Sequence, residues 1–175
     1  MTRRAVATGA GLVLVAAITV WALLGPRRET LALDLIDDLP NAVQVPGDYV
    51  VEPLELSGRT RRALIVGDTG RFIWSVTVPG RAWLRVSLGQ HPTAHTAPGD
   101  GTLFIVGAWD GEIWDELVSL VVNPYANHED RGWHDIAMDL SKYAGRTIEL
   151  RFVLRQRDTP DGDRPAWGDP RIVVR

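Results

Sequence analysis

The sequence predicts an all-β protein that folds as a sandwich of two antiparallel sheets. Nine short runs of β-type residues follow one another between residues 49 and 174, and turns rich in glycine, proline and aspartate separate them. No helical periodicity interrupts this succession. Consecutive strands without intervening helices pair as antiparallel neighbours, so two packed sheets are favoured and a closed barrel is the lesser option.

The first element is an apolar run from Ala5 to Gly25, which is 21 residues long and carries no charge. As a helix, at about 1.5 Å per residue, it spans roughly 30 Å, the thickness of a bilayer core. A cleaved signal peptide has a shorter apolar region, so an uncleaved anchor is favoured. Two arginines flank each end of the run, which leaves the orientation open from charge alone. We expect residues 1–28 to form a single-pass anchor in the cell membrane, with residues 29–175 outside the cytoplasm.

Residues 29–46 are expected to form a short amphipathic juxtamembrane helix and a linker. Within Glu29–Leu39, three leucines at positions 31, 35 and 39 recur every four residues, as on one face of a helix. Pro40 supplies the stop.

The sandwich domain is expected to occupy residues 47–175. Its strands show the two-residue period of a half-buried sheet, as in Phe72, Trp74 and Val76. The nine predicted strands are Tyr49–Leu56, Arg62–Val66, Phe72–Val78, Trp83–Leu88, Leu103–Ala108, Leu117–Val122, Trp133–Met138, Ile148–Leu154 and Ile172–Val174.

Residues 133–153, WHDIAMDLSKYAGRTIELRFV, join two strands through a compact turn that contains a tyrosine. This stretch resembles the same element of galactose-binding-like jelly rolls of the carbohydrate-binding type. The segments RRALIVGDTGRFIWSVTVPG, GDGTLFIVGAWDG and AWGDPRIVVR line up in order with further strands of that module, as found in bacterial membrane-anchored and sulfatase-associated proteins. The resemblance implies a jelly-roll fold, carbohydrate binding through loops at the sandwich edge, and a structural calcium ion.

The sequence departs from the sulfatases themselves. Their nucleophile is made from the cysteine or serine of a C/S-x-P-x-R motif, whereas this chain has no cysteine and no serine followed two residues later by proline. It also lacks a G-x-S-x-G elbow and a P-loop. We therefore expect no enzymatic activity, and an enzyme is the least favoured of three functional classes.

Seven tryptophans are the outlier in the composition. Core packing is the favoured interpretation for four of them, which lie within or next to predicted strands: Trp74, Trp83, Trp133 and Trp167. Trp109 and Trp114 bracket a turn, and there ligand contact and core packing are equally favoured. Together with Asp110, Asp115 and Asp100, they are the candidate ligand-binding residues, because sugar sites combine an indole face with polar side chains.

Asp158, Asp161 and Asp163 form the candidate metal site. Calcium takes about six to eight oxygen ligands, and closely spaced aspartates around a glycine supply several of them. The EF-hand order is absent, so an ordinary polar loop is the favoured alternative. A structural calcium ion is the one cofactor that the sequence suggests.

Charge excludes one class of partner. Beyond residue 28, 15 basic residues face 22 acidic ones, a net charge of −7, which disfavours nucleic acid. The favoured function is a membrane-anchored, extracytoplasmic, non-catalytic module that binds a surface glycan or polysaccharide. The alternative is a structural or accessory subunit that binds another envelope protein, such as a separate sulfatase-like enzyme. Exposed loop tryptophans favour the first function, and an exposed apolar sheet face favours the second.

Overall fold

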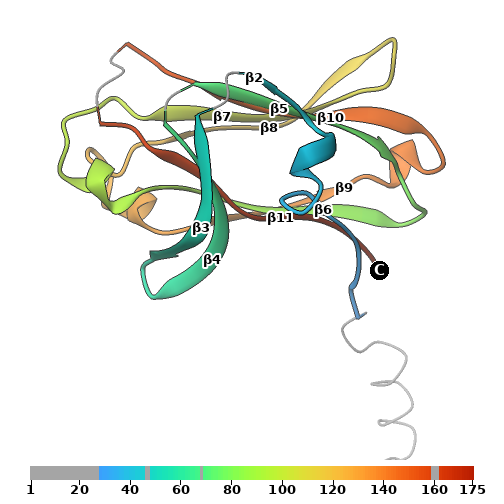
Figure 1. The fold of residues 1–175 in the computed structure, drawn as a ribbon, viewed down its shortest axis with the longest axis horizontal. Helices are drawn as coiled ribbons and strands as arrows, with labels where there is room; N and C mark the ends of the chain where they lie inside the picture. Colours follow the sequence, from blue (N-terminus) through green and yellow to red (C-terminus); the bar gives the residue numbers. More distant parts are fainter. Residues whose placement is uncertain (1–27, 46–47, 68, 159–161) are drawn as a thin grey trace, which may run out of the picture.

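The computed structural model describes residues 28–45, 48–67, 69–158 and 162–175. Within them two antiparallel sheets pack face to face (Figure 1), which confirms the predicted sandwich. The anchor predicted at Ala5–Gly25 lies outside the described residues. Among the residues that are described, no helix is both long enough and apolar enough to cross a bilayer.

All nine predicted strands are present, and two short strands precede them in the chain. The six-stranded sheet has the order β3-β4-β11-β6-β9, with β1 also paired to β11. Its strands are β1 (Thr30–Asp34), β3 (Tyr49–Leu56), β4 (Arg59–Val66), β6 (Ala82–Gln90), β9 (His134–Asp139) and β11 (Pro165–Val174). The five-stranded sheet has the order β2-β5-β10-β7-β8. It consists of β2 (Val43–Val45), β5 (Gly70–Thr77), β7 (Thr102–Trp109), β8 (Trp114–Val122) and β10 (Thr147–Arg155).

The helical elements in the described part of the chain are short 3-10 turns within the connections. They are η1 (Leu39–Asn41), η2 (Pro92–His95), η3 (His128–Arg131) and η4 (Ser141–Tyr143). None is long enough to form a layer of its own, so the two sheets must bury each other.

An aromatic chain fills the space between the sheets. The ring of Trp74 on β5 contacts Phe152 on β10 at 5.1 Å between centroids, and Phe152 lies 4.7 Å from Trp167 on β11. Phe104 on β7 meets Trp167 edge to face at 4.8 Å. These rings are almost fully buried and tie both sheets together. The outward positions of the five-stranded sheet are thereby held in fixed places.

The β3–β4 hairpin projects from the six-stranded sheet (Figure 1) and folds over part of its outer face. It forms a second apolar cluster of Leu54, Leu56, Ala63, Ile65, Trp133 and Ala166. Trp133 fits there because Gly89 and Gly168 lack side chains: a Cβ on either would lie about 3 Å from the indole ring. Trp74, Trp133 and Trp167 are therefore core residues as predicted, whereas Trp83 is half-buried on the sheet surface and its predicted core position is wrong.

The predicted amphipathic helix at Glu29–Leu39 is wrong. Residues 30–34 form β1, which pairs with the C-terminal half of β11 from Thr30 opposite Val174 to Asp34 opposite Arg171. The Asp34 carboxylate then accepts the N–H groups of the next turn, and this turn buries Leu35 completely. Pairing with β1 provides hydrogen-bond partners for backbone N–H and C=O groups in the C-terminal half of β11, which would otherwise be an open sheet edge. The free energy of this long-range pairing outweighs the local preference that the leucine spacing gives for a helix.

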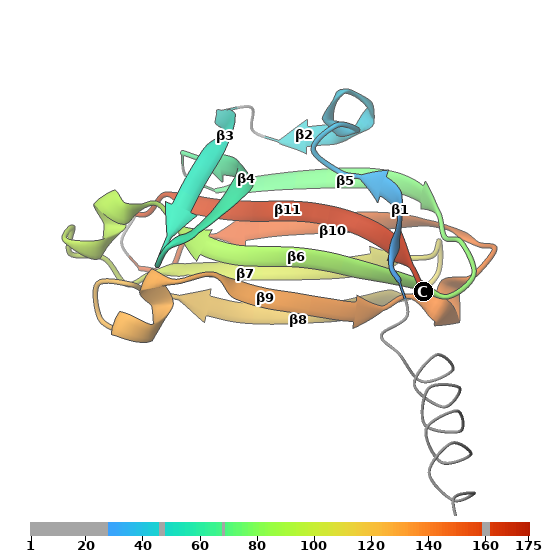
Figure 2. The same ribbon diagram turned by 90° about the horizontal axis from the view of Figure 1, so that it is seen from below.

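Both ends of the described domain meet beside β11. The Glu29 carboxylate pairs with the guanidinium groups of Arg85 and Arg175, the latter at 2.9 Å. Figure 2 shows β1 running beside the end of the chain. The first and last described residues therefore both lie at the six-stranded sheet.

Candidate ligand-binding face

The two candidate tryptophans face each other across the β7–β8 hairpin. Trp109 ends β7, Trp114 begins β8, and the two residues are paired in register. The turn between them is tight, since Gly111 has a φ of 102°, a conformation that glycine adopts without strain. Both side chains therefore start from the same edge of the outer face of the five-stranded sheet.

Asp110 is occupied by its own turn. Its carboxylate accepts the N–H of Ile113 at 2.8 Å and that of Glu112 at 3.0 Å, and it also pairs with Arg146. These two backbone donors, followed by the Arg146 guanidinium, lower the pKa of Asp110 to about 2 from its ordinary 3.8. The side chain is 9% exposed, so this aspartate holds the hairpin in shape.

Asp115 and Asp100 also bind neighbouring segments of the chain. The Asp115 carboxylate accepts the Tyr143 hydroxyl at 2.6 Å and the Lys142 ammonium at 3.0 Å, in that order the main causes of its lowered pKa. The Asp100 carboxylate accepts the backbone N–H of Asp158. Asp100 precedes the start of β7, whereas Asp115 lies on β8 opposite Ala108, near the other end of β7, so the candidate aspartates do not meet in one site.

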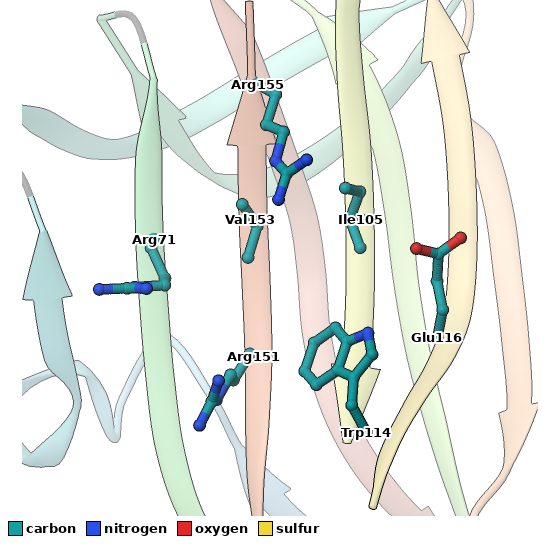
Figure 3. A pocket seen from close by; sticks show the side chains of 7 residues that line it. All are labelled: Arg71, Ile105, Trp114, Glu116, Arg151, Val153 and Arg155. Atoms are coloured by element: carbon teal, nitrogen blue, oxygen red, sulfur yellow. The ribbon is translucent and has the colours of Figure 1, made fainter. Parts of the chain in front are cut away.

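The Trp114 indole lies across β7, directly over Gly107. A Cβ at position 107 would stand only 2.0 Å from Cη2 of Trp114, so the ring occupies the space that a side chain would fill. Figure 3 shows the ring flat against the strand. The residue is 39% exposed, which leaves an indole face open to solvent.

A pocket of about 250 Å³ adjoins this ring on the outer face of the five-stranded sheet (Figure 3). Ile105 on β7 and Val153 on β10 form its floor and lie opposite each other in register. We call it the outer-face pocket; its lining consists of Arg71, Ile105, Trp114, Glu116, Arg151, Val153 and Arg155.

Strand register explains why these side chains gather. On the outward positions, Arg71 of β5 pairs with Val153 of β10, and Arg151 and Arg155 lie two residues to either side of Val153. Gly107 stands between Arg151 and Glu116 in the next row. Four strands from distant parts of the sequence thus contribute to one surface.

Arg151 is the polar neighbour of both tryptophans. Its guanidinium carbon lies 5.6 Å from the ring centroid of Trp114 and 5.9 Å from that of Trp109, within cation–π range. It also pairs with Glu149, two residues earlier on the same face, at 2.5 Å. These contacts hold the guanidinium beside the indole ring.

The candidate calcium site stays a prediction. Asp161 lies outside the described residues, Asp158 is exposed and Asp163 is buried. In the described part of the chain, no group of three or more histidine, aspartate or glutamate side chains is arranged to hold a metal ion.

The sequence comparisons reach only part of the chain. No family model matches it. An "Uncharacterized protein" of Archaeoglobus fulgidus is 39% identical over 101 residues, which are 55% of this chain and 25% of that protein. The chain therefore spans about a quarter of the length of this curated relative.

Solved structures of similar fold cover most of the chain. CBM51 from Clostridium perfringens GH95, in complex with methyl-galactose, has a TM-score of 0.57 at 12% identity, covering 81% of this chain and 99% of that module. CBM27-1 of Caldicellulosiruptor saccharolyticus, in complex with mannohexaose, has a TM-score of 0.54 at 14% identity, covering 85% and 98%. The M60 catalytic domain with CBM51-1 and CBM51-2 from Clostridium perfringens ZmpB reaches 0.58 at 13% identity, covering 84% of this chain but 15% of that one. The chain thus shares the β-sandwich fold of these modules, in agreement with the predicted fold.

Proposed function

We propose that this chain is a non-catalytic glycan-binding module and that the outer face of its five-stranded sheet holds the sugar. The observation that carries the proposal is the Trp114 indole, which lies flat over Gly107 with part of its ring exposed. A pyranose ring has an apolar face that stacks on such a surface, and a rigid aromatic side chain loses little entropy when it does so.

The surroundings of the ring support the same ligand class. Ile105 and Val153 provide an apolar floor, while Arg151 and Glu116 place a donor and an acceptor at its border. Binding sites for small polar molecules typically join an apolar surface to a few oriented polar groups. The proposed binding site therefore lies on the sheet face and does not use the predicted loop aspartates beside it.

We propose further that residues 1–28 anchor the module in the cell membrane, with residues 29–175 outside the cytoplasm. The uncharged run from Ala5 to Gly25 supports this. Protease added to intact cells should remove a C-terminal epitope tag. Protection of the tag until the cells are lysed would contradict the proposed orientation.

Calorimetry tests glycan binding with the full chain in detergent micelles, against a panel of neutral and acidic oligosaccharides. We expect saturable heat with at least one of them, and its loss in Trp114→Ala. Trp83→Ala is the matched control, because Trp83 is also a partly exposed surface tryptophan but lies on the opposite sheet. Binding that survives Trp114→Ala, or no heat with any saccharide, would contradict the proposal.

The alternative function, an accessory subunit for another envelope protein, has one observation in its favour. Val43 and Val45 of the edge strand β2 are 59% and 45% exposed, and they pair with Ile73 and Arg71 on the same outer face. A photo-crosslinker at position 43 should then capture one defined envelope protein in cells, whereas a crosslinker at position 81 should not. Equal labelling from both positions would argue against a docking surface.

A further inference from the structure

We propose that the outer-face pocket selects acidic saccharides, whose carboxylate or sulfate group is held by Arg155 and Arg71. This inference rests on the proposed glycan-binding function and names the ligand class for the same site.

Three arginines lie at neighbouring positions around one apolar patch. Arg71 is directly opposite Val153, and Arg151 and Arg155 are its diagonal neighbours on β10. Diagonal positions on a sheet are about 7–8 Å apart, a distance that arginine side chains span. In Figure 3, the Arg155 guanidinium lies between Val153 and Ile105, whereas Arg71 starts beside Val153 and its guanidinium points away from the floor. An anion resting on this floor would lie beside Arg155, and a rotamer change of the exposed Arg71 side chain would bring a second guanidinium to it.

Two of the three arginines on this face have no ion-pair partner among the described residues, although Glu116 also lines the pocket. Arg151 pairs with Glu149, but no carboxylate in the described part of the chain lies within ion-pair distance of Arg71 or Arg155. On the opposite sheet, by contrast, the arginines pair with acids: Arg59 and Arg61 with Asp135, and Arg85 with Glu29. Two unpaired cations on an otherwise acidic domain point to an anionic ligand.

The geometry also sets the spacing between the stacked sugar and its anionic group. Trp114 covers Gly107, which pairs with Arg151, and the Arg155 side chain reaches back to Val153, two residues from Arg151. At about 3.3 Å per residue, this separation is roughly 7 Å along the strand. A ligand that stacks on Trp114 therefore meets Arg155 with an anionic group carried on the stacked sugar or on the next unit. A planar guanidinium binds a carboxylate or sulfate through paired hydrogen bonds.

The test compares three probes by calorimetry with the full chain in detergent: oligogalacturonate for carboxylate, sulfated dextran oligosaccharides for sulfate, and neutral galacto-oligosaccharides. We expect one acidic probe to bind at least about tenfold more tightly than the neutral one, and its affinity to fall as salt is raised. Arg71→Gln and Arg155→Gln should each weaken acidic binding by roughly fivefold, as one ion pair at a partly exposed site allows, and should weaken neutral binding by less. The preferred acidic probe distinguishes carboxylate from sulfate.

Arg81→Gln is the matched control, since Arg81 is exposed in the turn between β5 and β6 and lies outside the pocket. It changes the net charge by the same amount, so an equal loss of affinity in this variant would mean general charge attraction and overturn the inference. Equal affinities for neutral and acidic probes, unaffected by the arginine variants, would overturn acid selection while the glycan-binding proposal stands. Binding of none of the probes would overturn both.

Discussion

Replacement of Gly107 by alanine should displace the Trp114 ring while leaving the sandwich folded. The added Cβ would lie 2.0 Å from Cη2 and 2.2 Å from Cζ2 of the indole. Carbon atoms in contact keep about 3.5 Å between them, so the ring must retreat by about 1.5 Å. Because the contacting atoms are the far end of a partly exposed side chain, the ring can swing outward without a backbone shift.

The expected change in stability is small and has two opposing parts. An indole forced off its rotamer costs about 0.5–1.5 kcal/mol, and the loss of its contact with Arg151 costs about 0.5–1 kcal/mol. Alanine in place of glycine in a strand stabilises the folded state by about 0.5–1 kcal/mol. Gly107→Ala should therefore lower the free energy of unfolding by about 1 kcal/mol, and it should weaken glycan binding as Trp114→Ala does.

A double-mutant cycle measures this coupling by urea unfolding followed by circular dichroism. In the Trp114→Ala background the clash is absent, so Gly107→Ala should become stabilising by about 0.5–1 kcal/mol. Gly80→Ala is the control, because a Cβ at that position meets no atom within 4 Å. If Gly107→Ala destabilises both backgrounds equally, or leaves glycan affinity intact, then Gly107 does not serve to seat the ring.

Three further predictions concern the fold and its titration. Leu35→Ala should lower the free energy of unfolding by about 2–5 kcal/mol, because Leu35 is fully buried. Leu31→Ala, at a position that is 56% exposed, should change it by less than about 0.5 kcal/mol. Equal effects of the two variants in urea unfolding would speak against the turn that follows β1. Gln90→Leu should lower the free energy of unfolding by about 1–3 kcal/mol in the same assay, because it removes the side-chain N–H donor that lies 2.7 Å from the buried carbonyl of Val122. An unchanged free energy of unfolding would show that this hydrogen bond is dispensable. Because the pKa of Asp110 is lowered, the contribution of this carboxylate to stability is complete above its ordinary pKa of 3.8 and is lost as the pH falls through about 2. An NMR titration of the carboxyl carbon should show a midpoint at about pH 2. A midpoint at the ordinary pKa would contradict the hairpin geometry.

The strands of the sandwich were predictable because each carries its own local pattern. Phe72, Trp74 and Val76 are buried and alternate with the more exposed Arg71, Ile73 and Ser75 on β5, and this period of two needs no knowledge of partners. The segment of β1 was misassigned because the four-residue leucine spacing resembles a helix face, while its true determinant is the edge of β11 at the other end of the chain. The three residues of β2 are too few to show any period.

The candidate site was predictable in part. Trp109 and Trp114 stood out through composition, and the structure places both on the outer face next to the pocket. The arginines are not among the predicted site residues, although Arg151 and Arg155 alternate with the buried Phe152 and Leu154 and therefore point outward. Their proximity to Trp114 depends on the order β5-β10-β7-β8, which no local pattern encodes. Sequence alone does not distinguish an acid that closes a turn, as Asp110 does, from one that binds a sugar.

The pairing of the first strand with the last has a practical consequence for engineering. Thr30 lies opposite Val174, so the entry and exit of the domain are about 5 Å apart. A domain with adjacent termini tolerates insertion into a host loop, or circular permutation with new ends placed in a surface turn. Since β1 and β11 belong to the six-stranded sheet, a fluorophore, bead or second module attached at either end would emerge opposite the outer-face pocket and leave it accessible.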